Sequence, residues 1–495
     1  MSICLEMKIF LSLLMFVAIA ADSGAQVMLT LDDAIAIGQR KSYSAKMADF
    51  RFMNDYWSYR NYRAAWLPSL NLSGTLMNYN RSIVEARDYE TGRVSYVDNN
   101  SLYNAVALSV NQNLPWADGT VSLRSNLSRL DQFDYNHETY NSTPLLLYYN
   151  QPLRRYSNLR WRRRIEPLQY ESAKRSYLET MQSITISVTG LFFQALSAQS
   201  DLERTKARHR DLTTLYEKTE RRLDLGLVTK GELLQLELSL LNVEMGISYS
   251  RLSLENALFN LFSYLHIDDY KNIVLVAPSY LPDLSIGVDD VIEKSHLNST
   301  HTIERQLQLL NAEKNLAYTK AETGLQVSLQ AQLGLTQTAD NPKGAYSRLK
   351  DNEVVGITFS LPIYDWGQRR GSIRMAKAQL ELARTQMHQS NMEHIQEIRT
   401  TVMHFNNQAG QCKISRRALD IAEETYLMAY KRYANGALSV TDLNNASNDL
   451  ENAHAQYLAQ LNTFWSYYYT IQRLTLYNYI KDKAIDCDFE AIIRN

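Results

Sequence analysis

The sequence predicts a mixed α and β protein built from two similar halves. Two proline-containing motifs, QPLRRYSNLR around Pro152 and LPIYDWGQRR around Pro362, lie 210 residues apart. Two glycine-containing motifs, RLDLGLVTKGELL around Gly226 and RYANGALSVTDLN around Gly436, lie the same 210 residues apart. A spacing shared by two unrelated motifs indicates a duplication, and it is too long for a solenoid with repeats of roughly 20–50 residues. Each half therefore reads as strand, proline, long helix, glycine turn and second helix.

The N-terminal segment predicts export. Lys8 precedes an apolar run at residues 9–21, and small residues follow at 23–25, so we expect residues 1–25 to be a secretory signal peptide. The apolar run is too short to span a membrane comfortably. Only Cys412 and Cys487 remain after cleavage. Two cysteines make neither a disulfide framework nor a metal site, although they could pair in an oxidising compartment.

The overall composition gives no sign of nucleic-acid binding and leaves room for very long helices. The formal net charge is −1, and the 495 residues include only 9 prolines. The 32 Tyr against 13 Phe suit a surface that is half in water and half in an apolar medium. No segment after the N-terminal run is apolar enough for a transmembrane helix.

The first repeat is expected at residues 26–265. Its expected elements are a helical segment at 30–66 with a break near 42–44, strands with period-two alternation near 70–76, 106–110, 121–123 and 145–152, and loops at 79–101 and 131–143. From Glu166 to Asp224 the chain has one proline, Pro167, which fits an early helical position. A helix of about 58 residues would span almost 90 Å. A second helix is expected from Lys230 to Leu265.

The second repeat is expected at residues 288–476, after a linker at 266–287 and before a C-terminal tail at 477–495. Its expected elements are a helix at 289–322, strands at 327–333 and 355–361, and helices at 371–433 and 438–476. The first half has 48 more residues than the second between corresponding junctions. These residues predict either an added hairpin or a large outer loop.

The strands and helices together predict a tube. Strands with one apolar and one polar face fit a transmembrane β-barrel. The few strands of one chain cannot close a barrel, and lipid does not tolerate open edges, so several copies are required. Four strands from each of three chains would supply about twelve. A single long helix of this kind is more typical of an ordinary coiled coil, and a single alternating strand is more typical of a soluble sheet. The combination of the two favours a trimeric β-barrel continued by a helical barrel.

At these motifs the sequence resembles the TolC-type outer-membrane efflux family. The strongest segment is Val355–Gln411, which contains GITFSLPIYDWGQRRGSIRMAKAQLELA; RYANGALSVTDLNNA at 432–446 comes second, and RLDLGLVTKGELL is a weaker match. The resemblance implies a homotrimeric barrel in the outer membrane of a Gram-negative bacterium, continued by an α-helical tunnel across the periplasm. It implies contact with outer-membrane lipid and docking to a periplasmic adaptor (membrane-fusion) protein and an inner-membrane RND or ABC-type transporter, without a cofactor.

The resemblance also assigns roles to individual residues. The tips expected to dock the adaptor contain Gly226, Leu227, Gly436, Ala437, Leu438 and Ser439. Asp442 falls where the family has a carboxylate lining the closed entrance, Asn445 where some members carry a second carboxylate, and Leu438 where an entrance-locking Arg can occur. Strand–helix junctions are expected at Pro68, Pro152 and Pro362, while Gln326 replaces the usual fourth proline.

The Asp442 assignment has a physical meaning and an alternative. A threefold ring of this carboxylate would concentrate negative potential in a narrow bore and favour cations. The alternative is an Asp that only stabilises the start of its helix through the helix dipole.

A cluster of arginines follows the first-half strands. It comprises Arg154, Arg155, Arg160, Arg162, Arg163 and Arg164. At the end of a barrel strand the cluster would lie on the periplasmic side of the membrane. There it could either contact lipid phosphates or form a solvated positive collar, and the sequence does not favour one over the other. Tyr148, Tyr149, Tyr156 and Trp161 nearby suit an interfacial aromatic belt.

The sequence contains no catalytic constellation and no metal-ligand spacing among its 9 histidines. We therefore expect not an enzyme but a channel subunit that acts as a passive exit duct. The alternative is a periplasmic coiled-coil adaptor or scaffold without a channel, and the alternating strands argue against it. An autonomous porin does not fit the length of the helices.

Overall fold

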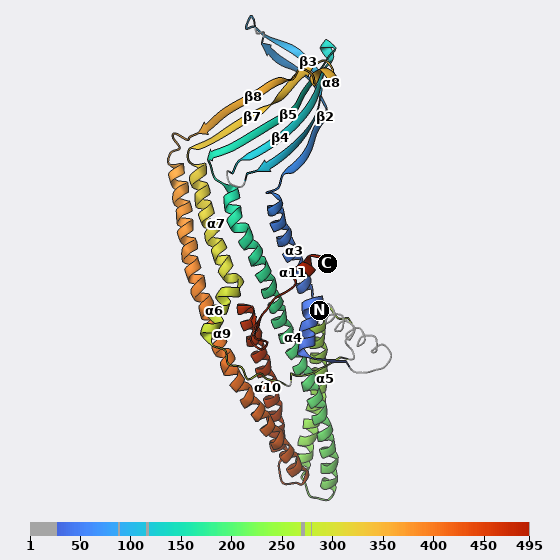
Figure 1. The fold of residues 1–495 in the computed structure, drawn as a ribbon. Coiled ribbons are helices and arrows are strands. Elements are labelled where there is room, and N and C mark those ends of the chain that lie inside the picture. The colour runs from blue at the N-terminus through green and yellow to red at the C-terminus, as the bar shows by residue number, and fades with distance from the viewer. Residues whose placement is uncertain (1–26, 88–89, 115–117, 269–272, 279, 495) are drawn as a thin grey trace, which may run out of the picture. The chain divides into compact units, whose positions relative to one another are not determined.

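The computed structural model describes residues 27–87, 90–114, 118–268, 273–278 and 280–494 (Figure 1). The expected signal peptide lies outside the described residues. The chain forms two compact units. The first combines the segments up to Met53, Ala173–Thr302 and Asn391–Asn495, and the second combines Asn54–Ser172 and Ile303–Ser390.

The second unit contains one antiparallel sheet of six strands, in the order β2-β3-β4-β5-β7-β8. Its strands are β2 (Ser69–Arg87), β3 (Val94–Asn113), β4 (Thr120–Gln132), β5 (His137–Arg154), β7 (Gln326–Ala339) and β8 (Lys350–Ser360). A short 3-10 turn, η1 (Phe133–Tyr135), joins β4 to β5, and a four-residue helix, α8 (Pro342–Ala345), lies between β7 and β8. The 48 additional residues of the first half therefore form strands, and the expected four strands per chain are six.

Most of the two expected loops, 79–101 and 131–143, are strand. The β2–β3 ladder continues to the Arg87–Val94 pair, and β4 and β5 pair as far as Gln132 and His137. These ends carry Asn, Arg, Ser and Asp on both faces, so they lack the alternation from which a strand is recognised. The backbone hydrogen bonds hold the ladder regardless of side-chain polarity.

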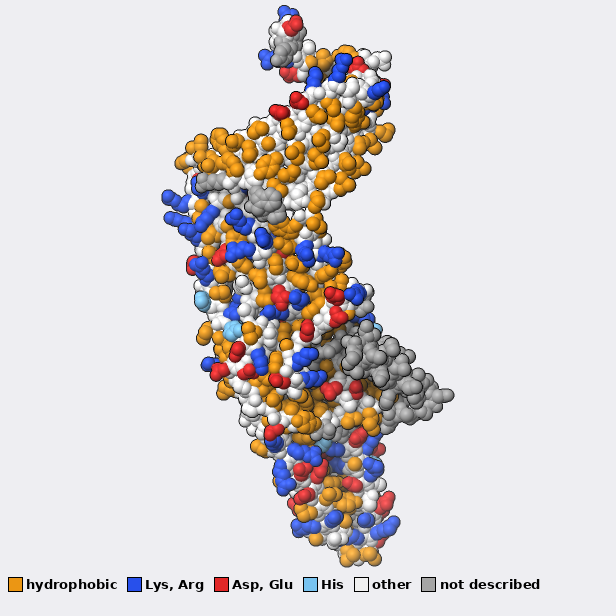
Figure 2. Space-filling model, in the orientation of Figure 1, with side chains coloured by type: hydrophobic (Ala, Val, Ile, Leu, Met, Phe, Trp, Pro, Cys, Tyr) orange, Lys and Arg blue, Asp and Glu red, His pale blue; other side chains and the backbone are white. Residues whose placement is uncertain are grey.

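One face of the sheet exposes apolar side chains. On the edge strand β2, Leu70 and Leu72 are 68% and 73% exposed, and on the other edge strand, β8, Ile357 and Phe359 are 65% and 73% exposed. Figure 2 shows hydrophobic side chains spread over this sheet. Such a face is what a transmembrane barrel presents to lipid.

Four helices connect to the sheet. Helix α3 (Tyr43–Ala64) leads into β2, α7 (Thr300–Glu322) leads into β7, α4 (Asn158–Asp224) follows β5, and α9 (Gln368–Ala434) follows β8. The prediction that Pro167 stands near the start of its helix is wrong, because it lies inside α4. The hydroxyl of Ser157 accepts a hydrogen bond from the Arg160 amide at 3.2 Å and so starts the helix eight residues earlier than expected.

The first unit is mostly helical. It contains α2 (Leu31–Lys41), α5 (Lys230–Leu265), α6 (Val288–Asn298), α10 (Val440–Thr475) and α11 (Phe489–Arg494), with parts of α3, α4 and α9. Two small sheets join β1 (Val27–Leu29) to β6 (Ile273–Leu275) and β9 (Tyr477–Asn478) to β10 (Lys483–Ala484). Its largest fully buried side chains include Phe192, Phe262, Phe405, Phe464 and Tyr468. Among the described residues, no helix is both long and apolar enough to cross a membrane.

The duplication holds to the residue along the hairpins. Helices α4 and α9 each have 67 residues and α5 and α10 each have 36, and both pairs start 210 residues apart. Helices α2 and α6 each have 11 residues but start 257 residues apart, because the additional strands lie between them and the hairpins. The single helix expected at 289–322 is broken at Ser299, where ψ is 154°, as the corresponding pair is broken at Ser42, where ψ is 149°.

Candidate functional site at the helical tips and strand–helix junctions

Both helical hairpins turn through the same hydrogen-bonded motif. Gly226 and Gly436 have φ of +67° and +78°, a left-handed conformation that favours glycine. Gly226 N–H donates to the Leu223 carbonyl at 2.9 Å, and the next amide, Leu227 N–H, donates to the Arg222 carbonyl at 2.9 Å. The amides of Gly436 and Ala437 repeat this pattern at 2.8 and 2.9 Å. This is the Schellman motif, which ends a helix by satisfying its last carbonyls.

The helix after each turn starts with a reciprocal cap. Thr229 Oγ1 accepts from the Glu232 amide at 3.2 Å, and the Glu232 carboxylate accepts from the Thr229 amide at 3.0 Å. In the second hairpin Ser439 Oγ accepts from the Asp442 amide at 3.1 Å and donates to Asp442 Oδ2 at 2.7 Å. Ser439 is therefore the cap of α10, and Asp442 is an acidic residue in its first turn, the placement that the helix-dipole alternative describes.

The expected entrance residues are accessible. Asp442 and Asn445 lie in the first two turns of α10, and both side chains are exposed. Glu232 occupies the position in α5 that Asp442 occupies in α10, 210 residues earlier. The sequence analysis missed this carboxylate, although the repeat spacing identifies it. Each chain thus carries two acidic side chains in equivalent tip positions.

A small apolar core holds the two hairpins together behind their turns. It buries the side chains of Leu212, Leu215, Leu236, Val243, Ala429, Tyr433, Val440, Leu443 and Ala446. Leu438, which stands where a locking Arg can occur, packs against this core, whereas Leu227 is 65% exposed. The two tips of one chain are therefore a single packed unit that presents Leu227 and Ala437 to solvent.

Polar contacts also join the hairpins. The Tyr426 hydroxyl donates to Asp211 Oδ2 at 2.9 Å, and burial together with this carboxylate raises the pKa of Tyr426. Thr219 Oγ1 donates to the Leu215 carbonyl, so the Tyr433 hydroxyl, 3.3 Å away, acts as donor to Thr219. These partners lie on different helices and more than 200 residues apart, and sequence reasoning had no signal for them.

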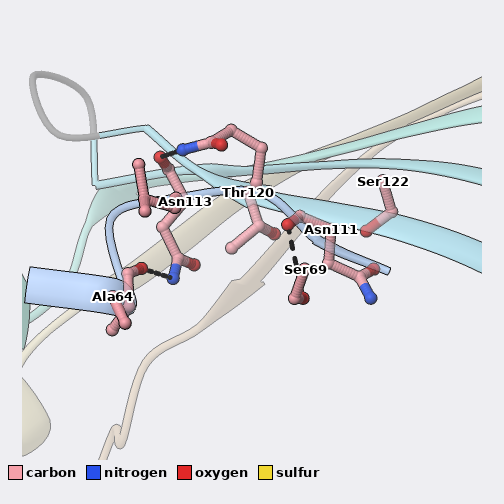
Figure 3. A pocket seen from close by; sticks show the side chains of 9 residues that line it. Ala64, Ser69, Asn111, Asn113, Thr120 and Ser122 are labelled. Carbon is pink, nitrogen blue, oxygen red and sulfur yellow. Dashed lines mark hydrogen bonds between the residues drawn. The ribbon is translucent and has the colours of Figure 1, made fainter. Parts of the chain in front are cut away.

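The strand–helix junction at Pro68 is held by side chains from β3. The Asn113 amide donates to the Ala65 carbonyl at 3.0 Å and the Gln112 amide to the Trp66 carbonyl at 2.9 Å. Figure 3 shows Asn113 reaching from its strand towards the end of α3 near Ala64, beside a hollow of about 300 Å³. Carbonyls left over at the end of a helix need such donors.

The other junctions differ in detail. Pro362 follows the end of β8, whereas Pro152 lies within β5 opposite Ser328, where the register shifts. Gln326, in place of a fourth proline, donates from its side-chain amide to the Glu322 carbonyl at 3.2 Å. It therefore satisfies the end of α7 as Gln112 and Asn113 satisfy the end of α3.

The arginines after β5 have a counterpart after β8. Arg160 and Arg164 near the start of α4 correspond to Arg370 and Arg374 near the start of α9, and all four are exposed. Figure 2 shows Lys and Arg side chains gathered where the helices meet the sheet. The structure thus extends the expected positive collar to both halves.

The helical part contains two groups whose pKa values are strongly shifted by burial. Burial, with Arg204 and Arg416 nearby, lowers the pKa of His454 to about 4. Burial raises the pKa of the Cys412 thiol to about 11, and Cys412 and Cys487 are both unpaired. Within the described part of the chain, no three His, Cys, Asp or Glu side chains gather as metal ligands.

The fold of this chain, a sheet continued by long paired helices, resembles that of solved outer-membrane channels. The Campylobacter jejuni CmeC outer membrane channel aligns with a TM-score of 0.66 over 94% of this chain and 88% of its own, at 15% identity. The Neisseria gonorrhoeae MtrE outer membrane channel aligns with a TM-score of 0.60 over 93% and 90%, at 13% identity. At these identities the likeness shows the fold.

The chain belongs to the outer membrane efflux protein family, whose profile matches residues 48–265 and 279–477. Outer membrane protein TolC of Escherichia coli is 22% identical over 303 residues, which cover 58% of this chain and 62% of TolC. Nodulation protein T of Rhizobium leguminosarum is 22% identical over 205 residues, 40% of this chain and 41% of that protein. The matches thus span less than two thirds of these relatives.

Family membership confirms the expected fold class of two repeats of strands and long helices, and the outer-membrane localisation. The family is one of transport channels rather than enzymes. Membership in this family does not support the alternative of a periplasmic adaptor.

Proposed function

We propose that three copies of this chain form a passive outer-membrane channel of a tripartite efflux or secretion system. The observation that carries the proposal is the sheet with two open, apolar edges. Among the described residues, strands β2 and β8 each pair on one side only, and both expose leucine, isoleucine, valine or phenylalanine at alternate positions. Unpaired backbone groups are not stable in lipid, so the edges must pair with other copies.

Closure by further copies is geometrically consistent. The sheet is antiparallel throughout and has an even number of strands, so β8 of one copy runs antiparallel to β2 of the next. Three copies of a six-stranded sheet give eighteen strands, within the range of about 8 to 26 found in outer-membrane barrels. The barrel is therefore wider than the twelve strands expected from the sequence.

The remaining roles follow from the same arrangement. The tips at Gly226, Leu227, Gly436, Ala437, Leu438 and Ser439 dock a periplasmic adaptor, which links the duct to an inner-membrane RND or ABC-type transporter. Asp442 and Asn445 line the periplasmic entrance, where three copies of the carboxylate attract cations. The exposed arginines near the sheet contact the phosphates of outer-membrane lipid.

Reconstitution tests the channel directly. Native mass spectrometry of the detergent-purified protein should give the mass of three chains, and the same preparation should conduct ions across a planar bilayer. A purified protein that stays monomeric, or a trimer that does not conduct, would refute the proposal.

A further inference from the structure

The two hairpins of one chain meet along a polar seam in the first unit. Arg208 of α4 lies 2.8 Å from a carboxylate oxygen of Glu451 in α10. Its guanidinium also lies 3.4 and 3.5 Å from the side-chain oxygens of Asn444 and Asn448. On the same face of α4, Asp211 accepts the hydroxyl of Tyr426 from α9. We call these contacts the polar seam.

The 210-residue repeat gives each seam residue a counterpart in the other hairpin, and the counterparts are apolar or aromatic. In α9, Ala418 corresponds to Arg208 and Ile421 to Asp211. In α5, Leu234, Leu238 and Leu241 correspond to Asn444, Asn448 and Glu451. The counterpart of Tyr426 is Tyr216 in α4. The polar residues of the seam therefore correspond, at positions 210 residues away, to residues that are mostly apolar.

The aliphatic members of this set that contact solvent lie on α5 and α9. Leu234, Leu238 and Leu241 are 53%, 60% and 52% exposed, and Ile421 is 49% exposed. Exposed Met245, Leu252 and Phe259 continue the α5 row at intervals of seven residues, the heptad period of a coiled coil. An exposed apolar row of this length marks an interaction surface.

We propose that these residues form the seam between neighbouring copies, with α5 of one copy packed on α9 of the next. The contact would copy the geometry by which α10 packs on α4 within the chain. In a closed ring each hairpin has two neighbours, one from its own chain and one from the next copy. The proposal rests on the proposed trimer and adds which surfaces meet in it.

The ring then contains two chemically different seams in alternation. The seam inside each chain combines an apolar core with an ion pair and hydrogen bonds around Arg208 and Asp211. The seam between copies is held by leucine, isoleucine and alanine. Salt screens partly exposed charge pairs and does not weaken apolar packing, so the seam inside each chain should lose more stability with ionic strength than the seam between copies.

Transplanting the polar pair tests the assignment. Ala418→Arg and Leu241→Glu place the Arg208–Glu451 pair at the seam between copies. Each single change should reduce the trimer fraction in detergent, because it leaves one charge in an apolar contact. In the double variant, the association constant of the trimer should be at least about tenfold higher than in either single variant. A like-charge control, Ala418→Glu with Leu241→Glu, places two negative charges at the same positions and should not recover.

Crosslinking gives an independent reading in the full-length protein. In a Cys412→Ala, Cys487→Ser background, Leu238→Cys with Ala418→Cys should join copies through a short bifunctional thiol reagent. Leu238→Cys with Arg417→Cys, one residue away around α9, should join them far less. The proposed seam is wrong if the wild type is trimeric, the double charge variant forms no more trimer than the single variants, and the two cysteine pairs crosslink with equal yield. If the wild type is monomeric and does not conduct, the proposed function itself fails.

Discussion

Arg222, in the last turn of α4, lies against Gly436, the residue that ends α9. A Cβ atom at Gly436 would be 3.0 Å from the Arg222 Cζ and 3.1 Å from Nη1, closer than ordinary contact allows. The corresponding Gly226 has no atom within 4 Å of such a Cβ. The first hairpin thus reaches across to the turn of the second, while the reverse contact is absent.

Substitution at the two glycines should therefore have unequal effects. Gly226→Ala loses the left-handed turn conformation and should cost about 1 kcal/mol of stability. Gly436→Ala has the same cost and also displaces Arg222, so the thermal midpoint of the purified trimer should fall further. Adding Arg222→Ala should bring the Gly436 variant close to the Gly226 variant. Equal midpoints for the two single variants would show that the Arg222 contact contributes nothing.

Capping and ion selectivity at Asp442 can be separated. Asp442→Asn removes the negative charge and should lower the cation preference measured from reversal potentials in a planar bilayer. Ser439→Ala removes the cap and should cost about 1 kcal/mol, with cation preference retained. Asp442→Asn without any change in reversal potential would leave Asp442 only as an acidic residue that stabilises the start of α10.

Acid should destabilise the helical part through His454. Its pKa is lowered to about 4 in the folded chain, so the unfolded chain takes up a proton first as the pH falls. The stabilisation is present above about pH 6.5, the ordinary histidine value, and is lost as the pH falls towards 4. His454→Gln should reduce the decrease of the thermal midpoint between pH 7 and pH 4. An unchanged slope would exclude His454 as its source.

The junction at Pro68 depends on a side chain from β3. Asn113→Ala leaves the Ala65 carbonyl without its donor and should cost about 1 kcal/mol. Asn111→Ala is the matched control, because the Asn111 amide donates to Ser109 of its own strand at 3.3 Å. Thermal unfolding monitored in the strand region should move for the first variant only, and equal shifts would contradict a junction role.

The repeat and the helical hairpins could be predicted from the sequence because their signals are local. Glycine turns and the scarcity of proline define α4, α5, α9 and α10 to within a few residues, apart from the early start of α4. The strand ends could not be predicted, since residues such as Asn99 and Asn100 carry no apolar–polar alternation although their backbones belong to the β2–β3 ladder. The contacts of Arg208 and Tyr426 likewise depend on packing between helices distant in sequence.

The additional hairpin has a consequence for how sheet and helices match in width. Four helices join six strands, and β3 and β4 have no helix of their own. Four helices side by side, about 10 Å apart, occupy roughly 40 Å. Strands about 4.8 Å apart and tilted by about 40° occupy roughly 6 Å each, so six of them cover nearly the same arc and four would cover about 25 Å. With β3 and β4, the sheet is therefore nearly as wide as the layer of four helices that joins it, and no larger strand tilt is needed to match the two widths.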